Sequence, residues 1–338
     1  MGIKKFLKVD KNMINEERIK IKGDIELGAT IAYPDKEEKR PLVLLIAGTG
    51  SLNRDGNSSA IKLNIYKDLS NYFVEQGCVC IRYDKRGTHE SKGKLVTHTL
   101  SNLVGDAKSI IDYARELPFV DENKIIVCGH SEGAMVGTLL TEKTDVNGLI
   151  LLGGAGISLK EAMYYQNNKM LEESKDGKGF MYWLMRKTTK PEKITQQITQ
   201  QVEGMFEKAN KSNKNMFFYR GSIMPTKYMQ EHGALTGADY VEKLRKYSGK
   251  VLAITGTGDL QANNEALSAF DGIAHIETFA PAGVNHMLRE VDDNNSMLTM
   301  MKQYKRLAKT PLNPETMDRI SGWLQDNFAN SIELEDDK

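Results

Sequence analysis

Two apolar patterns alternate along much of the chain. Short continuous apolar runs occur at 41–47, 78–83 and 125–128, and such runs are typical of strands buried on both faces of a parallel sheet. Between them, apolar residues recur at three- and four-residue spacings, for example over 102–117, which predicts amphipathic helices. The repeated strand–helix units indicate an α/β fold whose mostly parallel sheet carries helices on both faces.

The remaining elements follow from the same patterns. Residues 17–33 alternate apolar and polar positions, with Gly23 and Gly28 as interruptions, which predicts an antiparallel pair of strands. Further strands are predicted at 146–152, 251–254 and 276–279, and further helices near 66–76, 294–308 and 314–328.

One long block interrupts the alternation. Residues 158–248 contain no apolar strand run, but they carry long polar helical segments and clustered aromatic residues and methionines. We therefore expect a helical cap (lid) insertion over 158–248 between two strands, with residues 1–157 and 249–338 forming the core domain. Large apolar side chains in such a block need burial, so Trp183 and Phe217 are predicted to contribute to an apolar roof over the substrate.

Composition narrows the class of protein. The 338 residues are 40% hydrophobic and 27% charged, with a formal net charge of +1, so no long-range field favours nucleic acid or an anionic membrane. No run approaches the ~18 apolar residues of a membrane span, and residues 1–10 lack the apolar core of a signal peptide. We expect a cytoplasmic protein that binds neither nucleic acid nor membrane. The sequence does not decide the oligomeric state, so it leaves open whether the protein forms a homodimer.

The three cysteines suggest no metal or redox chemistry. Cys78, Cys80 and Cys128 all fall in predicted strands, where they are interpreted as small buried hydrophobes. No Cys/His spacing suits zinc, and we expect neither a metal nor a cofactor.

The pentapeptide Gly129-His130-Ser131-Glu132-Gly133 follows an apolar strand and precedes a helical pattern. This is the context in which G-x-S-x-G indicates a nucleophile elbow, with the serine on a strained turn. The glycines are explained if side chains at those positions would collide with the neighbouring strand and helix. A glycine-rich loop that merely turns the strand into the helix is the alternative interpretation.

A serine nucleophile needs a base, and the base needs a carboxylate to orient it. Asp259 directly follows the strand at 251–254, and His286 follows the strand at 276–279. Each residue by itself is more readily interpreted as a turn former or a structural histidine. Their joint occurrence after Ser131, in the order serine, acid, histidine, predicts a triad with Ser131 as nucleophile, His286 as general base and Asp259 as orienting acid.

The same reasoning predicts an oxyanion hole and leaves two charged loops to interpret. The expected donors are the backbone N–H groups of Glu132 and Thr49. Gly48 and Gly50 would let the backbone approach the substrate, although a tight turn also explains them.

Asp84 and Arg86 are predicted to make an ion pair that shapes their loop, whereas a role for Arg54 and Asp55 in the site is left open.

Several motifs of this chain resemble those of α/β-hydrolase-fold serine esterases. The closest resemblance is to bacterial carboxylesterases with a helical cap between the sixth and seventh strands, and it covers about 25–155 and 250–328. The motifs that carry it are Ala47-Gly48-Thr49-Gly50, Arg54-Asp55-Gly56-Asn57, Asp84-Lys85-Arg86-Gly87, Gly129-His130-Ser131-Glu132-Gly133, Gly258-Asp259-Leu260-Gln261 and Asn285-His286-Met287-Leu288.

The resemblance implies an eight-stranded sheet, the Ser131–His286–Asp259 triad and hydrolysis of short-chain acyl esters. One departure is Ala47, which stands where the family usually has a histidine that braces the oxyanion loop. We expect a carboxylesterase that cleaves short-to-medium acyl esters through an acyl-enzyme. A peptidase or acyltransferase with the same triad, or a non-catalytic binding protein, are the alternatives. A peptidase would need an anchor for a free amino terminus.

Overall fold

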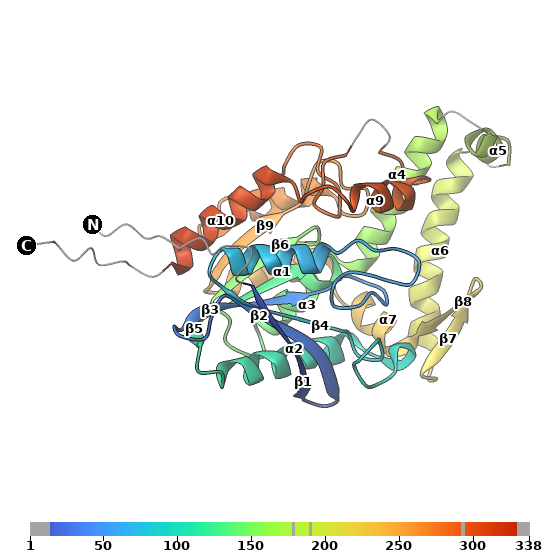
Figure 1. Ribbon diagram of the computed structural model, residues 1–338. Coiled ribbons are helices and arrows are strands. Elements are labelled where there is room, and N and C mark those ends of the chain that lie inside the picture. The colour runs from blue at the N-terminus through green and yellow to red at the C-terminus, as the bar shows by residue number, and fades with distance from the viewer. Residues whose placement is uncertain (1–13, 178–179, 189–190, 292–294, 330–338) are drawn as a thin grey trace, which may run out of the picture.

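An eight-stranded sheet with the order β1-β2-β4-β3-β5-β6-β9-β10 lies at the centre of the molecule (Figure 1). The computed structural model describes residues 14–177, 180–188, 191–291 and 295–329. The strands of the sheet are β1 (Asn15–Lys22), β2 (Glu26–Tyr33), β3 (Arg40–Ile46), β4 (Val79–Tyr83), β5 (Val120–His130), β6 (Gly148–Leu152), β9 (Lys250–Ile254) and β10 (Ile276–Phe279). β2 pairs antiparallel with β1 and β4, and the other neighbouring strands are parallel. The predicted fold class is confirmed.

The helices outside the insertion cover both faces of the sheet. Leu42 and Leu44 of β3 belong to the buried cluster under α2 and α3, whereas Val43 and Leu45 belong to the cluster under α1 and α10. Because successive strand residues point to opposite faces, a strand covered on both sides is apolar throughout. These helices are α1 (Ile65–Glu75), α2 (Leu100–Arg115), α3 (Glu132–Leu140), α9 (Met300–Leu307) and α10 (Pro314–Phe328), with short 3₁₀ turns η2 (Leu95–Thr97) and η3 (Asn264–Phe270). The helix predicted near 294–308 is shorter than expected, and 292–294 lie outside the described residues.

All three cysteines lie in one buried layer. Cys78, Cys80 and Cys128 belong to the cluster under α1 and α10, and each is a free thiol. Burial raises the pKa of the Cys80 thiol to about 12, so this thiol stays protonated and packs as a small apolar side chain.

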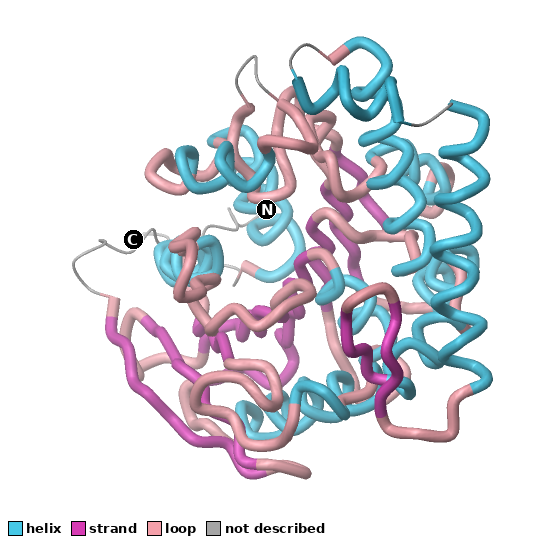
Figure 2. Tube along the Cα trace, turned by 90° about the vertical axis from the view of Figure 1, so that its right-hand side faces the viewer, coloured by secondary structure: helices cyan, strands magenta, loops and turns pink. Residues whose placement is uncertain are grey.

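The chain between β6 and β9 forms the insertion (residues 158–248). These are the sixth and seventh strands of the sheet in chain order, and Figure 2 shows the long insertion helices gathered on one side of it. The first helix begins at a capping box, in which Ser158 and Glu161 satisfy each other's backbone N–H groups. The elements are α4 (Leu159–Asp176), α5 (Phe180–Thr188), α6 (Pro191–Lys211), β7 (Met216–Tyr219), β8 (Ser222–Pro225), α7 (Thr226–Gly233) and α8 (Gly237–Lys246).

The hairpin of β7 and β8 corrects the expectation that the insertion contains no strands. Its strands are only four residues long and pair with each other outside the main sheet. The turn residues Arg220 and Gly221 both have positive φ, 47° and 90°, as tight two-residue hairpin turns require. β10 is equally short, so length alone does not hide such a strand, but β8 begins at Ser222 and ends at Pro225 and therefore offers no continuous apolar run.

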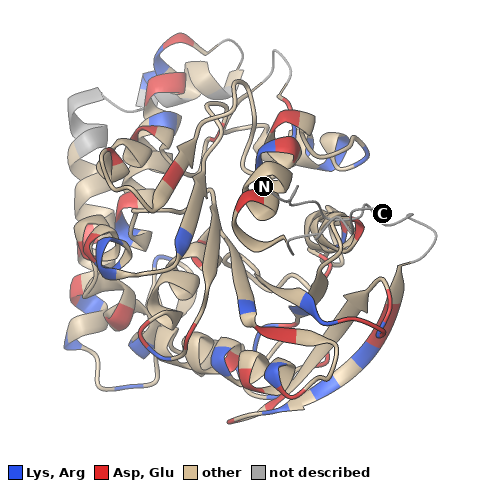
Figure 3. Ribbon diagram, turned by 90° about the vertical axis from the view of Figure 1, so that its left-hand side faces the viewer, with Lys and Arg blue, Asp and Glu red and all other residues tan. Residues whose placement is uncertain are grey.

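The surface carries both signs of charge. In the view of Figure 3, lysines and arginines are interspersed with aspartates and glutamates, in keeping with the net charge of +1. Among the described residues, we find no helix whose length and apolar character would let it cross a membrane.

The sharpest turn of the fold joins β5 to α3. β5 ends at His130 and α3 begins at Glu132, so Ser131 alone makes the turn, with φ 57° and ψ −121°. A Cβ atom on Gly133 would lie 2.1 Å from the carbonyl oxygen of Ile46, and one on Gly129 would lie 2.2 Å from that of Gly133. Strand, turn and helix therefore pack so closely that neither position admits a side chain.

This packing predicts opposite effects for two helical glycines. We expect Gly133→Ala to lower the free energy of unfolding by about 3 kcal/mol, because rigid backbone has to move. Gly105→Ala in α2, where no atom outside its chain neighbours and the backbone of its own helix lies within 4 Å of the added carbon, should raise it by up to about 1 kcal/mol through helix propensity. Urea denaturation of both variants measures this, and a Gly133→Ala protein as stable as wild type would contradict the packing argument.

Candidate active site

Ser131 lies in a cavity of about 280 Å³ at the carboxyl edge of the sheet. The cavity is lined by the loop after β3, by the elbow and by the loop that carries His286. Helix α4 of the insertion supplies the opposite wall. The α4 residues that line it are Leu159, Ala162, Met163 and Gln166.

Asp259 and His286 are in direct contact. His286 Nδ1 lies 2.7 Å from Asp259 Oδ2, while Asp259 Oδ1 accepts hydrogen bonds from the backbone N–H groups of Gln261 and Ala262. Both side chains are almost completely buried. The carboxylate is therefore held rigidly, and a histidine whose Nδ1 proton faces it presents Nε2 for proton transfer. A Cβ atom on Gly153 would lie 2.9 Å from His286 Nδ1, so only glycine fits beneath the pair.

The loop that carries His286 is braced from behind by a buried arginine. Arg289 donates to the carbonyl oxygens of Met287 and Leu63 and pairs with Asp68 at 2.7 Å. No hydrogen bond joins Ser131 Oγ to His286 in the described part of the chain, although both residues line the same cavity. Such contacts are often long before substrate binds.

A chain of hydrogen bonds links the oxyanion loop to the loop of His286. The Gly48 N–H donates to the Tyr66 hydroxyl at 2.8 Å, and that hydroxyl lies 3.0 Å from His130 Nδ1. His130 Nε2 lies 2.8 Å from the His286 carbonyl oxygen. Since that oxygen only accepts, Nε2 carries the proton and Nδ1 accepts from Tyr66. Burial, with a smaller contribution from His286, lowers the pKa of His130 to about 3.

A buried ion pair lies beside this chain. Lys85 Nζ donates to the carbonyl oxygen of Gly48 at 2.5 Å and to Glu132 Oε2 at 3.0 Å. Tyr66 and Lys85 thus hold the loop that follows Ala47. The sequence pattern by itself assigns no role to Lys85. The signal that points to it is its position two residues after β4, at the same edge of the sheet as the elbow.

The insertion contributes to the same ion pair through α7. The Tyr228 hydroxyl donates to Glu132 Oε1, and His232 Nε2 lies 3.4 Å from that oxygen. Burial alone would raise the pKa of Glu132, but the charge of Lys85 and the contacts of His232 and Tyr228 hold it well below its usual range. Glu132 is therefore a buried carboxylate that stays ionised.

The two charged loops have structural partners. Asp84 pairs with Arg54 at 2.6 Å and Arg86 pairs with Asp106 at 2.6 Å. Each residue does make an ion pair that shapes its loop, but not with the other. Asp55 pairs with Arg82 at 2.8 Å, and neither Arg54 nor Asp55 lines the cavity of Ser131.

Three of the predicted substrate-binding residues lie elsewhere. Trp183 is 48% exposed and stacks on Phe180, whereas Phe217 is buried in the core of the insertion. Gly50 is exposed and does not line the cavity, although Gly48 and Thr49 do. Aromatic composition indicated burial, but not which surface the side chains would meet.

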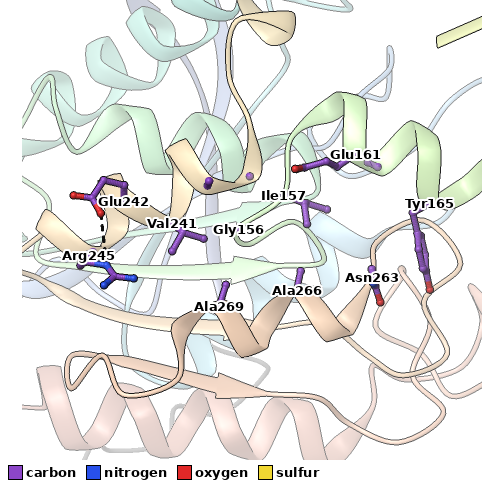
Figure 4. Close-up of a pocket in the computed structure, with 13 residues that line it drawn as sticks. Gly156, Ile157, Glu161, Tyr165, Val241, Glu242, Arg245, Asn263, Ala266 and Ala269 are labelled. Carbon is purple, nitrogen blue, oxygen red and sulfur yellow. Dashed lines mark ion pairs between the residues drawn. The ribbon is translucent and has the colours of Figure 1, made fainter. Parts of the chain in front are cut away.

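A second cavity, of about 630 Å³, adjoins the first. Figure 4 shows side chains from α4, α8 and η3 around it, with the ion pair of Glu242 and Arg245 at one end. Ile157 and Ala162 line both cavities. They form a shared wall, and we expect smaller side chains at these two positions to join the cavities.

The profile of the family described as X-Pro dipeptidyl-peptidase (S15 family) matches residues 22–286. Esterase EstD of Thermotoga maritima is 24% identical over 191 residues, which are 55% of this chain and 45% of EstD. The chain thus spans about half the length of that relative.

Solved structures show the fold. The structure of Est1E from Butyrivibrio proteoclasticus with bound ferulic acid has a TM-score of 0.53 and 22% identity, covering 87% of this chain and 98% of that one. The structure of the α/β hydrolase GrgF from Penicillium sp. sh18 has a TM-score of 0.51 and 14% identity, and the match covers 88% of this chain and 99% of that one. The architecture is the α/β-hydrolase fold that the sequence motifs indicated.

The buried His130 predicts a pH effect on stability. Below pH 6.5 the unfolded chain binds a proton at His130 that the folded protein does not bind until about pH 3, so the free energy of unfolding falls as pH falls. At pH 5 this amounts to about 2 kcal/mol. In His130→Gln, the free energy of unfolding should lack this part of the pH dependence below pH 6.5. Above pH 6.5 it should change with pH in the same way as that of the wild type. Urea denaturation of both proteins between pH 7 and 4.5 measures this. If the unfolding free energy of wild type and of His130→Gln falls equally with pH, the buried imidazole is not neutral.

Proposed function

The chain belongs to the X-Pro dipeptidyl-peptidase (S15) family, and from this premise we propose that it is a serine hydrolase that cleaves short-to-medium carboxylic esters. The observation that carries the proposal is the shared cavity of Ser131 and His286, with the His286 imidazole 2.7 Å from the buried Asp259 carboxylate. The esterases named among its relatives support the same reaction class.

The proposed reaction passes through an acyl-enzyme. Ser131 Oγ attacks the ester carbonyl carbon while His286 Nε2 takes the hydroxyl proton, and Asp259 stabilises the imidazolium. The carbonyl oxygen becomes an oxyanion that accepts from the N–H groups of Thr49 and Glu132. As the intermediate collapses, the alkoxide leaves with the proton from His286. Water then attacks the acyl-enzyme with the same base, which releases the carboxylic acid and free Ser131.

The lining of the cavity favours an ester over a peptide with a free amino terminus. A peptidase of that kind needs a carboxylate that can meet the ammonium group of its substrate. Glu132 is the one carboxylate among the described residues that line the cavity, and its oxygens already contact Lys85 and Tyr228. Apolar side chains such as Leu159 and Met163 instead suit an acyl chain. We propose that the insertion acts as the cap that supplies this surface.

The proposal predicts covalent labelling of one serine. A fluorophosphonate probe should add one equivalent to Ser131, located by peptide mapping, and Ser131→Ala should lose both the label and ester turnover, on the order of 10⁴-fold or more. Wild-type protein should hydrolyse acyl p-nitrophenyl esters faster than X-Pro p-nitroanilides. Label on another serine would end the triad assignment, and a preference for the anilides would favour the peptidase.

The shared wall predicts a change in acyl specificity. Ile157→Ala should join the two cavities and raise kcat/KM for long acyl chains relative to acetyl esters by about 10-fold, the lower end of the range for one methylene in an apolar pocket. Trp183→Ala, on the exposed surface of the insertion, is the control and should leave the chain-length profile unchanged. If Trp183→Ala shifts the profile and Ile157→Ala does not, the acyl chain lies elsewhere.

A further inference from the structure

Gly48 is held from both sides by buried side chains. Its N–H donates to Tyr66 and its carbonyl oxygen accepts from Lys85 Nζ. The peptide bond to Thr49 is trans, as are the other described peptide bonds, and it is planar. The Thr49 N–H therefore points away from Lys85, opposite to the Gly48 carbonyl. Because the Gly48 N–H is already engaged, Thr49 is left as the donor of this loop.

Lys85 also reaches the residue that carries the second proposed donor. Its Nζ lies 3.0 Å from Glu132 Oε2, and both side chains are nearly inaccessible to solvent. Glu132 opens α3, and the first N–H groups of a helix have no acceptor within the helix. Lys85, on the loop after β4, thus links the two segments on which the Thr49 and Glu132 N–H groups lie, through a hydrogen bond to Gly48 after β3 and an ion pair with Glu132 after β5.

The insertion closes this arrangement on the other oxygen of Glu132. Tyr228 and His232 lie one turn apart on α7, and both face Glu132 Oε1. The ring centroids of Tyr228 and His232 are 4.4 Å apart, and His98 packs on the other side at 4.6 Å from Tyr228. The carboxylate therefore has a partner from the core on one oxygen and partners from the insertion on the other.

We propose that Lys85 is a positioning residue for the oxyanion hole: it aims the N–H groups of Thr49 and Glu132 at one point, and Tyr228 of the insertion keeps Glu132 in place to receive it. This inference rests on the proposed function, because it assigns a role within that reaction. A role in stability alone explains the pair less well, since buried ion pairs add little stability over apolar pairs of the same size.

The test compares variants in catalysis and in affinity for a transition-state analogue. Lys85→Met should lower kcat by roughly 10- to 100-fold with KM nearly unchanged, because misaimed donors weaken the transition state more than the ground state. Tyr228→Phe, which removes a single hydroxyl, should lower kcat by roughly 10-fold. A trifluoromethyl ketone that adds to Ser131 as an oxyanion should lose affinity in each variant by the same factor as kcat/KM.

Controls separate this role from folding and from the proposed function. Tyr240→Phe removes a buried insertion hydroxyl that has no hydrogen-bond partner among the described residues, and it should leave kcat and analogue affinity unchanged. If Lys85→Met does not fold because Glu132 is left unpaired, Lys85→Met/Glu132→Gln removes both charges and should show the same catalytic loss. Folded variants with wild-type kcat and analogue affinity overturn the inference. Failure of wild-type Ser131 to react with the fluorophosphonate overturns the proposed function itself.

Discussion

The backbone of Ser131 is the constraint on which the surrounding structure depends. A non-glycine residue at φ 57° and ψ −121° costs on the order of 1–3 kcal/mol, and such a conformation persists only where its neighbours enforce it. Here the enforcement comes from the sheet. The Ser131 N–H donates to the carbonyl oxygen of Leu152 in β6, while Gly133 lies against the end of β3. Three strands therefore fix a single turn.

Several polar and charged side chains are buried at one edge of the sheet, and each needs a partner in direct contact. The Glu132 side chain is buried, with only 2% of its surface exposed. An unpaired carboxylate in such a position would take up a proton or destabilise the fold. Lys85, Tyr228 and His232 surround it instead. His130, in contrast, is buried in its neutral form, with Tyr66 on one ring nitrogen and a backbone carbonyl on the other. Glu132 and His130 thus each have partners that suit their own charge.

Most of the fold followed from local patterns in the sequence, but the ion pairs did not. The elbow motif and the strand ends before Asp259 and His286 are short-range features, so they predict that these residues lie at one edge of the sheet, and the structure brings His286 Nδ1 to 2.7 Å from Asp259 Oδ2. Lys85, Glu132 and Tyr228 meet only after three distant segments pack together, and no spacing in the sequence encodes which charges pair. The aromatic run around Trp183 predicts burial, but Trp183 is 48% exposed, because composition does not determine which of several aromatic side chains face the core.

The contact between α7 and Glu132 has a consequence for how such a protein changes over evolution. An insertion between two neighbouring parallel strands, here β6 and β9, can in principle be exchanged as a module, since only its two ends are joined covalently to the core. In this chain the insertion also supplies Tyr228 and His232 to a carboxylate that belongs to the core. A replacement segment would have to bring its own donors to Glu132, or the core would have to lose that charge first. The insertion and the elbow are thus bound to diverge together rather than separately.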